Sequence, residues 1–128
     1  MEISRNPVGW FELPVSNMDR AIQFYETVIG INFHRQQLGD LDMAFFPMIQ
    51  NGEGSPGSLI SNENYTPSKE GVLIYLTAFS GDLANELGRV AAAGGKVLKE
   101  KTQISPDYGY MGLFIDSEGN RVALHSRE

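Results

Sequence analysis

The residues best suited to chemistry in this chain are an indole and a carboxylate two positions apart, in the stretch VGWFELPV. Because side chains alternate between the two faces of a strand, Trp10 and Glu12 are expected on one face, with Phe11 and Leu13 packed on the other. A carboxylate in a partly desolvated pocket can accept a proton from a bound compound or return one. The alternative is a structural role for Glu12, in a hydrogen bond to a neighbouring strand or an ion pair with an arginine.

Further side chains suited to contact with a ligand lie on two later strand-like stretches, near residues 72–77 and 121–126. The same alternation predicts two sets that face a common cavity: Leu73, Tyr75 and Thr77 in the first stretch, and Arg121, Ala123 and His125 in the second. Trp10 and Tyr75 are suited either to stacking on a planar ligand or to filling a core. His125 lies near the last residue of the sequence, where a histidine is more typically exposed to solvent than part of a binding site.

The residue types and their spacing argue against a metal site and against a nucleotide-binding site. The chain has no cysteine, which excludes disulfides, thiolate ligands and cysteine nucleophiles. A catalytic metal site normally needs about three protein ligands, and Glu12 with His125 would still need a third. The run Gly52–Gly57 satisfies G-x-G-x-x-G, but a proline and then SLIS follow instead of a helix, so it is interpreted as a loop.

The elements that must position these residues come from a weak internal repeat. Residues 8–30 and 72–94 each read as a strand, a polar turn, an amphipathic helix and a terminating glycine. Apolar residues at helical spacing predict the two helices: Met18, Ala21, Ile22, Tyr25 and Ile29 in the first copy, and Leu83, Leu87, Val90 and Ala91 in the second. Ser16 and Asp19 are the expected capping box of the first helix, and Gly30 its left-handed end.

Three strand-like segments follow each predicted helix. They cover residues 32–37, 41–48 and 58–61 in the first half, and 96–104, 110–115 and 121–126 in the second, where the turn Ser117–Asn120 closes the last hairpin. The predicted fold is therefore α+β, with two βαβββ modules in one domain over residues 1–128. The modules fall at about 7–61 and 72–127, joined by a linker at 62–71. Helices on the outer face of a mixed sheet leave the other face to form a cup.

Net charge and hydropathy exclude some classes of binding partner. The net charge of −6, with the ten Lys and Arg residues scattered, argues against nucleic acid as the main partner. No segment is apolar and long enough to span a bilayer, so no membrane partner is expected. The beginning MEISRNPVGW does not resemble a signal peptide, which predicts a cytoplasmic location.

The stretches ELPVSNMDRAIQFYETVIG and GLFIDSEGNRVALHS, together with the repeat, resemble the vicinal oxygen chelate superfamily. This group contains glyoxalases, bleomycin- and fosfomycin-resistance proteins and extradiol dioxygenases. The resemblance covers about residues 7–126 and implies paired βαβββ modules around a cavity. In metal-dependent members it also implies a His, Gln or Glu on each of four strands, where the metal acts as a Lewis acid.

The positions that the resemblance assigns to metal ligands hold other residue types here. They are Trp10, Leu73 and Ala123, with the fourth falling at Ser58 or Leu59. Indole and alkyl side chains do not coordinate divalent ions. We therefore expect the usual metal site to be missing and no cofactor to be needed.

The predicted function is binding of a small organic molecule in the cup, lined by Trp10, Glu12, Leu73, Tyr75, Arg121, Ala123 and His125. A metal-independent lyase or isomerase reaction would use Glu12 as its acid and base. The alternatives are non-catalytic sequestration, as in drug-resistance relatives, a metal-dependent lyase or dioxygenase with a non-standard site, and a regulatory module without a ligand. A homodimer through an open sheet edge is also expected.

Overall fold

The computed structural model describes residues 2–128 and contains two helices and eight strands. The first module consists of β1 (Phe11–Pro14), α1 (Met18–Ile29), β2 (His34–Leu38), β3 (Leu41–Phe45) and β4 (Gly57–Ser61). The second consists of β5 (Tyr75–Thr77), α2 (Leu83–Leu87), β6 (Lys96–Ser105), β7 (Gly109–Ile115) and β8 (Arg121–Ser126). The predicted α+β class and the order β-α-β-β-β in each half are confirmed.

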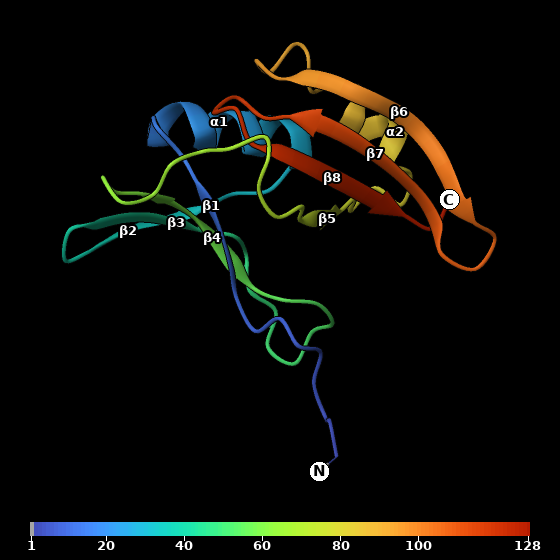
Figure 1. The fold of residues 1–128 in the computed structure, drawn as a ribbon, viewed down its shortest axis with the longest axis horizontal. Coiled ribbons are helices and arrows are strands. Elements are labelled where there is room, and N and C mark those ends of the chain that lie inside the picture. The colour runs from blue at the N-terminus through green and yellow to red at the C-terminus, as the bar shows by residue number, and fades with distance from the viewer. Residues whose placement is uncertain (1) are drawn as a thin grey trace.

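The strands form two four-stranded mixed sheets with the orders β1-β4-β3-β2 and β5-β8-β7-β6. In each sheet the first strand pairs in parallel with the last strand of its module, and the other pairs are antiparallel. The edge strands β1 and β5 lie on the sides of the two sheets that are nearest each other in Figure 1. The two halves therefore repeat one topology, and their first strands border the same central region.

Helix α1 begins and ends by different means. Gly30 adopts the predicted left-handed conformation, with φ of 78°, and its amide donates to the carbonyl of Glu26. The predicted capping box of Ser16 and Asp19 is wrong, because the N-cap is Asn17, whose Oδ1 accepts from the amide of Arg20 at 3.0 Å. The amide of Ser16 instead donates to the distant side chain of Glu118.

Several other element boundaries differ from the predicted ones: β2 begins at His34 and not at residue 32, and β5 begins at Tyr75, three positions after the predicted start at 72. Strand β3 ends at Phe45 and not at Met48, since Pro47 has no amide hydrogen to continue the ladder. Helix α2 ends at Leu87, and turns lead from Gly88 to Gly94. Asp82 caps α2 by accepting from the amide of Ala84. Glycine at position 88 disfavours a longer helix.

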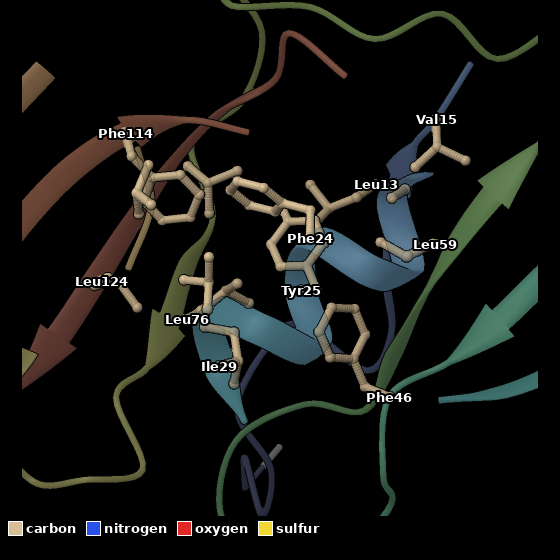
Figure 2. Packing of buried hydrophobic residues seen from close by; sticks show 14 of the residues in the cluster. Leu13, Val15, Phe24, Tyr25, Ile29, Phe46, Leu59, Leu76, Phe114 and Leu124 are labelled. Carbon is tan, nitrogen blue, oxygen red and sulfur yellow. The ribbon is translucent and has the colours of Figure 1, made fainter. Parts of the chain in front are cut away.

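One hydrophobic core serves both modules, and α1 lies at its centre. Figure 2 shows side chains of α1 between Leu13, Leu59 and Phe46 of the first module on one side and Phe114 and Leu124 of the second on the other. The Phe24 ring lies 5.9 Å from that of Phe114, and the Tyr25 ring lies 6.1 Å from that of Phe46. The apolar stripe of α1 therefore packs against both sheets at once.

The turn Asp116–Asn120 of the second module holds the start of α1. The Glu118 side chain is inaccessible to solvent and accepts from the amides of Ser16 and Asn17, at 2.9 and 2.7 Å. It also receives two hydrogen bonds from the guanidinium of Arg20, at 2.7 and 3.0 Å. A carboxylate at this place satisfies free amides and complements the helix dipole. The turn therefore joins the two modules as well as closing a hairpin.

The rest of this turn is buried beside α1. Asp116 accepts from the Tyr25 hydroxyl at 2.6 Å, and Asn120 donates to the carbonyl of Pro14 at 2.7 Å. The side-chain oxygen of Asn120 accepts from the amide of Ser68, in the linker between the modules. At the other end of α1, Arg89 donates to the carbonyl of Val28 at 2.9 Å. These bonds fix how β1 and β5 lie relative to each other. Among residues 2–128, no helix is long and apolar enough to cross a membrane.

Candidate functional site

A pocket of about 810 Å³ lies between the two modules. Three segments line it: the residues before and within β1, the loop after β3, and the chain around β5. The end of α1 contributes Ile29. The lining residues come from both modules, and β1 and β5 are the edge strands on either side of the pocket.

Four of the predicted site residues meet in this pocket. Trp10 and Glu12 come from the β1 side, and Leu73 and Tyr75 come from the β5 side, more than sixty positions away in the sequence. Strand alternation places Glu12 on the face opposite to Leu13, which is in the core. Glu12 is half-buried, whereas Trp10 and Tyr75 are 38% and 50% exposed. These side chains can therefore contact a bound molecule.

The three predicted residues of β8 are not in the pocket lining. Ala123 is fully buried and pairs in register with Tyr75. The Nε2 atom of His125 lies 2.6 Å from the carbonyl oxygen of Tyr108, and Arg121 donates to the carbonyl of Gly71 at 3.3 Å. His125 and Arg121 are thus tied to nearby loops, and any contact with a ligand stays a prediction.

A buried hydroxyl lies beside Glu12 in the sheet. Ser58 of β4 pairs in register with Glu12 on one side and with Phe45 on the other. The rings of Phe45 and Trp10 contact each other at 5.7 Å between centroids. Ser58 has no exposed surface, and its Oγ has no hydrogen-bond partner among the described residues. Glu12 and Ser58 are therefore polar neighbours beside an aromatic pair.

Some lining residues were not identified from the sequence. Phe79, which is 69% exposed, lies two positions after Thr77, and extending the strand alternation would have found it. Pro47 and Ile49, in the loop after β3, give no such signal, because they follow no strand or helix period. Only the folded chain brings this loop opposite β5.

The residues at the expected ligand positions do not fit a divalent metal ion. Trp10 and Leu73 line the pocket with an indole and an alkyl group, and Ala123 contributes a buried methyl group. The fourth position holds the Ser58 hydroxyl or the core residue Leu59. Within residues 2–128 no group of three or more His, Asp and Glu side chains is arranged to hold a metal ion. A Lewis-acid step has no donor set to support it here.

We expect added metal to leave the stability of this protein unchanged. A metal ion raises Tm only if it binds the folded state. Because the expected ligand positions hold no suitable donors, titration with Zn²⁺, Ni²⁺, Mn²⁺, Co²⁺ or Fe²⁺ should give no saturable rise in Tm. The measurement is thermal unfolding of protein purified without an affinity tag or chelator, with metal content determined alongside. Stoichiometric metal, or a saturable rise of roughly 5 °C or more, would contradict this expectation.

Comparisons with known proteins agree on one family. The model of the Glyoxalase/Bleomycin resistance protein/Dioxygenase superfamily matches residues 8–124. A glyoxylase-like domain-containing protein of Didymella fabae is 24% identical over 125 residues, which cover 94% of this chain and 93% of that protein. A glyoxalase/bleomycin resistance protein from Albidiferax ferrireducens superposes with a TM-score of 0.70 at 15% identity, covering 96% of this chain and 100% of that one.

A point mutant of glyoxalase I from Zea mays superposes with a TM-score of 0.71 at 20% identity. The match covers 94% of this chain but 47% of the maize chain, so this chain spans about half the length of that enzyme. Structural similarity at these identities concerns the fold alone.

Proposed function

The chain belongs to the glyoxalase/bleomycin resistance protein/dioxygenase superfamily, and from this premise we propose that it binds a small organic molecule in the pocket between β1 and β5. The observation that carries the proposal is Glu12, a half-buried carboxylate in a pocket with mostly apolar walls. The ion pairs of the described residues join other side chains, so none engages Glu12. Binding sites combine such walls with a few polar groups that orient the ligand.

The same carboxylate supports a metal-independent reaction. In this proposal Glu12 accepts a proton from the bound compound and returns it, either to a neighbouring atom of the same compound or to a leaving group. The first course is an isomerisation and the second an elimination by a lyase. Trp10 and Tyr75 hold the apolar part of the compound and reduce the access of water to the proton being transferred.

Sequestration without chemistry is the second candidate. It is favoured because the lining holds no histidine, lysine or arginine that could assist Glu12, Ser58 is inaccessible, and His125 of β8 is engaged by a loop carbonyl. A sequestering protein needs only the aromatic walls and one orienting group. The two candidates differ in the fate of the bound compound.

The substitution Glu12→Gln separates catalysis from sequestration. Trp10 is the single tryptophan of the chain and lines the pocket, so its fluorescence reports binding from a library of metabolite-sized compounds. For a compound that the wild type converts, we expect Glu12→Gln to abolish turnover while its affinity stays within about tenfold, because the shape of the site is kept.

The matched control is Glu63→Gln, an exposed carboxylate in the linker. Conversion of the bound compound would be followed by NMR. Binding without conversion in the wild type would support sequestration, and unchanged turnover in Glu12→Gln would remove Glu12 from the mechanism. If no compound in the library altered the fluorescence of Trp10, the binding proposal would fail.

We also propose a homodimer, supported by exposed apolar side chains of the pocket lining. Ile49 is 77% exposed, Val72 91% and Phe79 69%. Exposed apolar patches of this kind commonly mark interfaces, and many superfamily members dimerise. Light scattering should give twice the chain mass of 14.1 kDa, and Val72→Asp should give the monomer. Ile104→Asp, on β6, is the control. A monomeric wild type would contradict the proposal. The cytoplasmic location also stays a prediction.

A further inference from the structure

The charge of the pocket restricts the class of molecule that it can accept. The lining contains two carboxylates, Glu12 and Glu53, and no lysine, arginine or histidine. The four ion pairs among the described residues are Arg20–Glu118, Lys101–Asp82 and the two of Arg35 with Asp19 and Asp42. Neither pocket carboxylate is in an ion pair, so no cationic side chain offsets the charge of the half-buried Glu12 or of the exposed Glu53.

The aromatic content of the same pocket adds to this preference. Trp10, Tyr75 and Phe79 line it and are between 38% and 69% exposed, so their rings are available to a ligand. Aromatic ring faces carry partial negative charge and attract ammonium and guanidinium groups, and tryptophan does so most strongly. An aromatic wall beside an unpaired carboxylate is therefore a site for positive charge, whereas an aromatic wall alone would suit any planar molecule.

We propose that the pocket selects organic cations, with the charged nitrogen beside Glu12 and the apolar body against Trp10 and Tyr75. This inference rests on the proposed binding function and names its ligand class. The net charge of −6 acts in the same direction, because it accelerates the approach of a cation and slows that of an anion. A ligand with a carboxylate or phosphate would meet two like charges and no cationic side chain.

Three probes of similar size and different charge test the proposal: benzyltrimethylammonium, benzyl alcohol and benzenesulfonate. With the fluorescence of Trp10 as readout, we expect saturable binding of the ammonium compound, roughly tenfold tighter than that of the alcohol, and none of the sulfonate. Raising the salt concentration from about 20 to about 300 mM should weaken the ammonium complex, because exposed charges are screened.

Two variants test the role of the carboxylate. Glu12→Gln should weaken the ammonium complex roughly three- to tenfold and leave the affinity for benzyl alcohol unchanged. Glu63→Gln, with a charge removed from the exposed linker, should change neither affinity. Equal effects of the two variants would overturn the part assigned to Glu12.

The possible failures are distinguishable. If benzyl alcohol or benzenesulfonate bound as tightly as the ammonium compound, the preference for cations would be refuted while the proposed binding function stood. The same conclusion would follow if all three probes failed and a neutral or anionic compound of the wider library bound. If neither the probes nor the library changed the fluorescence of Trp10, both proposals would fail together.

Discussion

Replacing Asp116 with alanine is expected to lower the free energy of unfolding by about 3–5 kcal/mol, the largest loss that we predict for a single side chain. Its carboxylate accepts four hydrogen bonds: from the Tyr25 hydroxyl at 2.6 Å, the Glu118 amide at 2.9 Å, and the amide and side chain of Asn120 at 2.9 and 3.1 Å. Asp116 is 3% exposed, so water cannot replace the lost acceptor for the buried donors.

The charge of Asp116 reduces this loss. Burial raises the pKa of Asp116, although hydrogen bonds from Tyr25 and Asn120 oppose the change. Burial, with the nearby Asp116 carboxylate, also raises the pKa of the Tyr25 hydroxyl well above its ordinary value, so that this hydroxyl stays a donor. Because the buried carboxylate is held at some cost, deleting it costs less than four independent hydrogen bonds would.

A double-mutant cycle with Tyr25→Phe checks the argument. Urea unfolding followed by circular dichroism should show that Tyr25→Phe alone costs about 1–2 kcal/mol, and that the cost is much smaller once Asp116 is already alanine. Asp107→Ala, in the exposed loop before β7, is the control. Additive effects of the two substitutions, or a loss below about 1 kcal/mol for Asp116→Ala, would show that the buried network contributes little.

The sequence predicted the repeat and the pocket residues of two strands because those features follow local periods. Alternation along a strand placed Trp10 with Glu12 and Leu73 with Tyr75 on one face, and all four line the pocket. The alternation was less selective than expected, because Phe11, Ile74 and Leu76 of the opposite face line the pocket too. The two pairs meet because β1 and β5 are equivalent edges of repeated modules. The contribution of β8 was less predictable, because loop carbonyls compete for His125 and Arg121.

The start of α1 shows why the remainder could not be predicted. Ser16 and Asp19 have the spacing of a capping box, which is a local motif. In the fold, the amide of Ser16 bonds to Glu118, which is 102 positions away, and Asn17 provides the cap. A local pattern cannot reveal such a long-range acceptor. For the same reason, the sequence indicated that the turn Ser117–Asn120 closes a hairpin but not that it joins the modules.

Replacing Glu118 with glutamine is the second substitution for which a large effect is expected, and its effect depends on pH. At pH 7 we expect the free energy of unfolding to fall by about 2–3 kcal/mol. Glutamine has an amide nitrogen in place of one carboxylate oxygen, and this nitrogen cannot accept the hydrogen bonds that α1 or Arg20 donates. Glu63→Gln is the matched control, since it removes one negative charge from the exposed linker. The measurement is urea unfolding of the wild type and both variants between pH 7 and pH 3.5.

The pH dependence has opposite signs for the two carboxylates of this turn. Burial of Glu118 favours its neutral form, but hydrogen bonds from Arg20, Asn17, Ser117 and Ser16 outweigh burial and hold its pKa below the ordinary 4.5. Its contribution to stability is therefore present above pH 4.5 and is lost as the pH falls through the lower value of the folded state. The raised pKa of Asp116 works the other way: the part of its contribution that depends on pH is full below pH 3.8 and is lost as the pH rises through its folded value, while its hydrogen bonds to Tyr25, Glu118 and Asn120 remain. In Glu118→Gln only the second effect remains, so the difference in unfolding free energy from the wild type should be largest near neutral pH and shrink below pH 4.5. A difference that stayed constant down to pH 3.5 would mean that the lost stability comes from packing and not from the charge of Glu118.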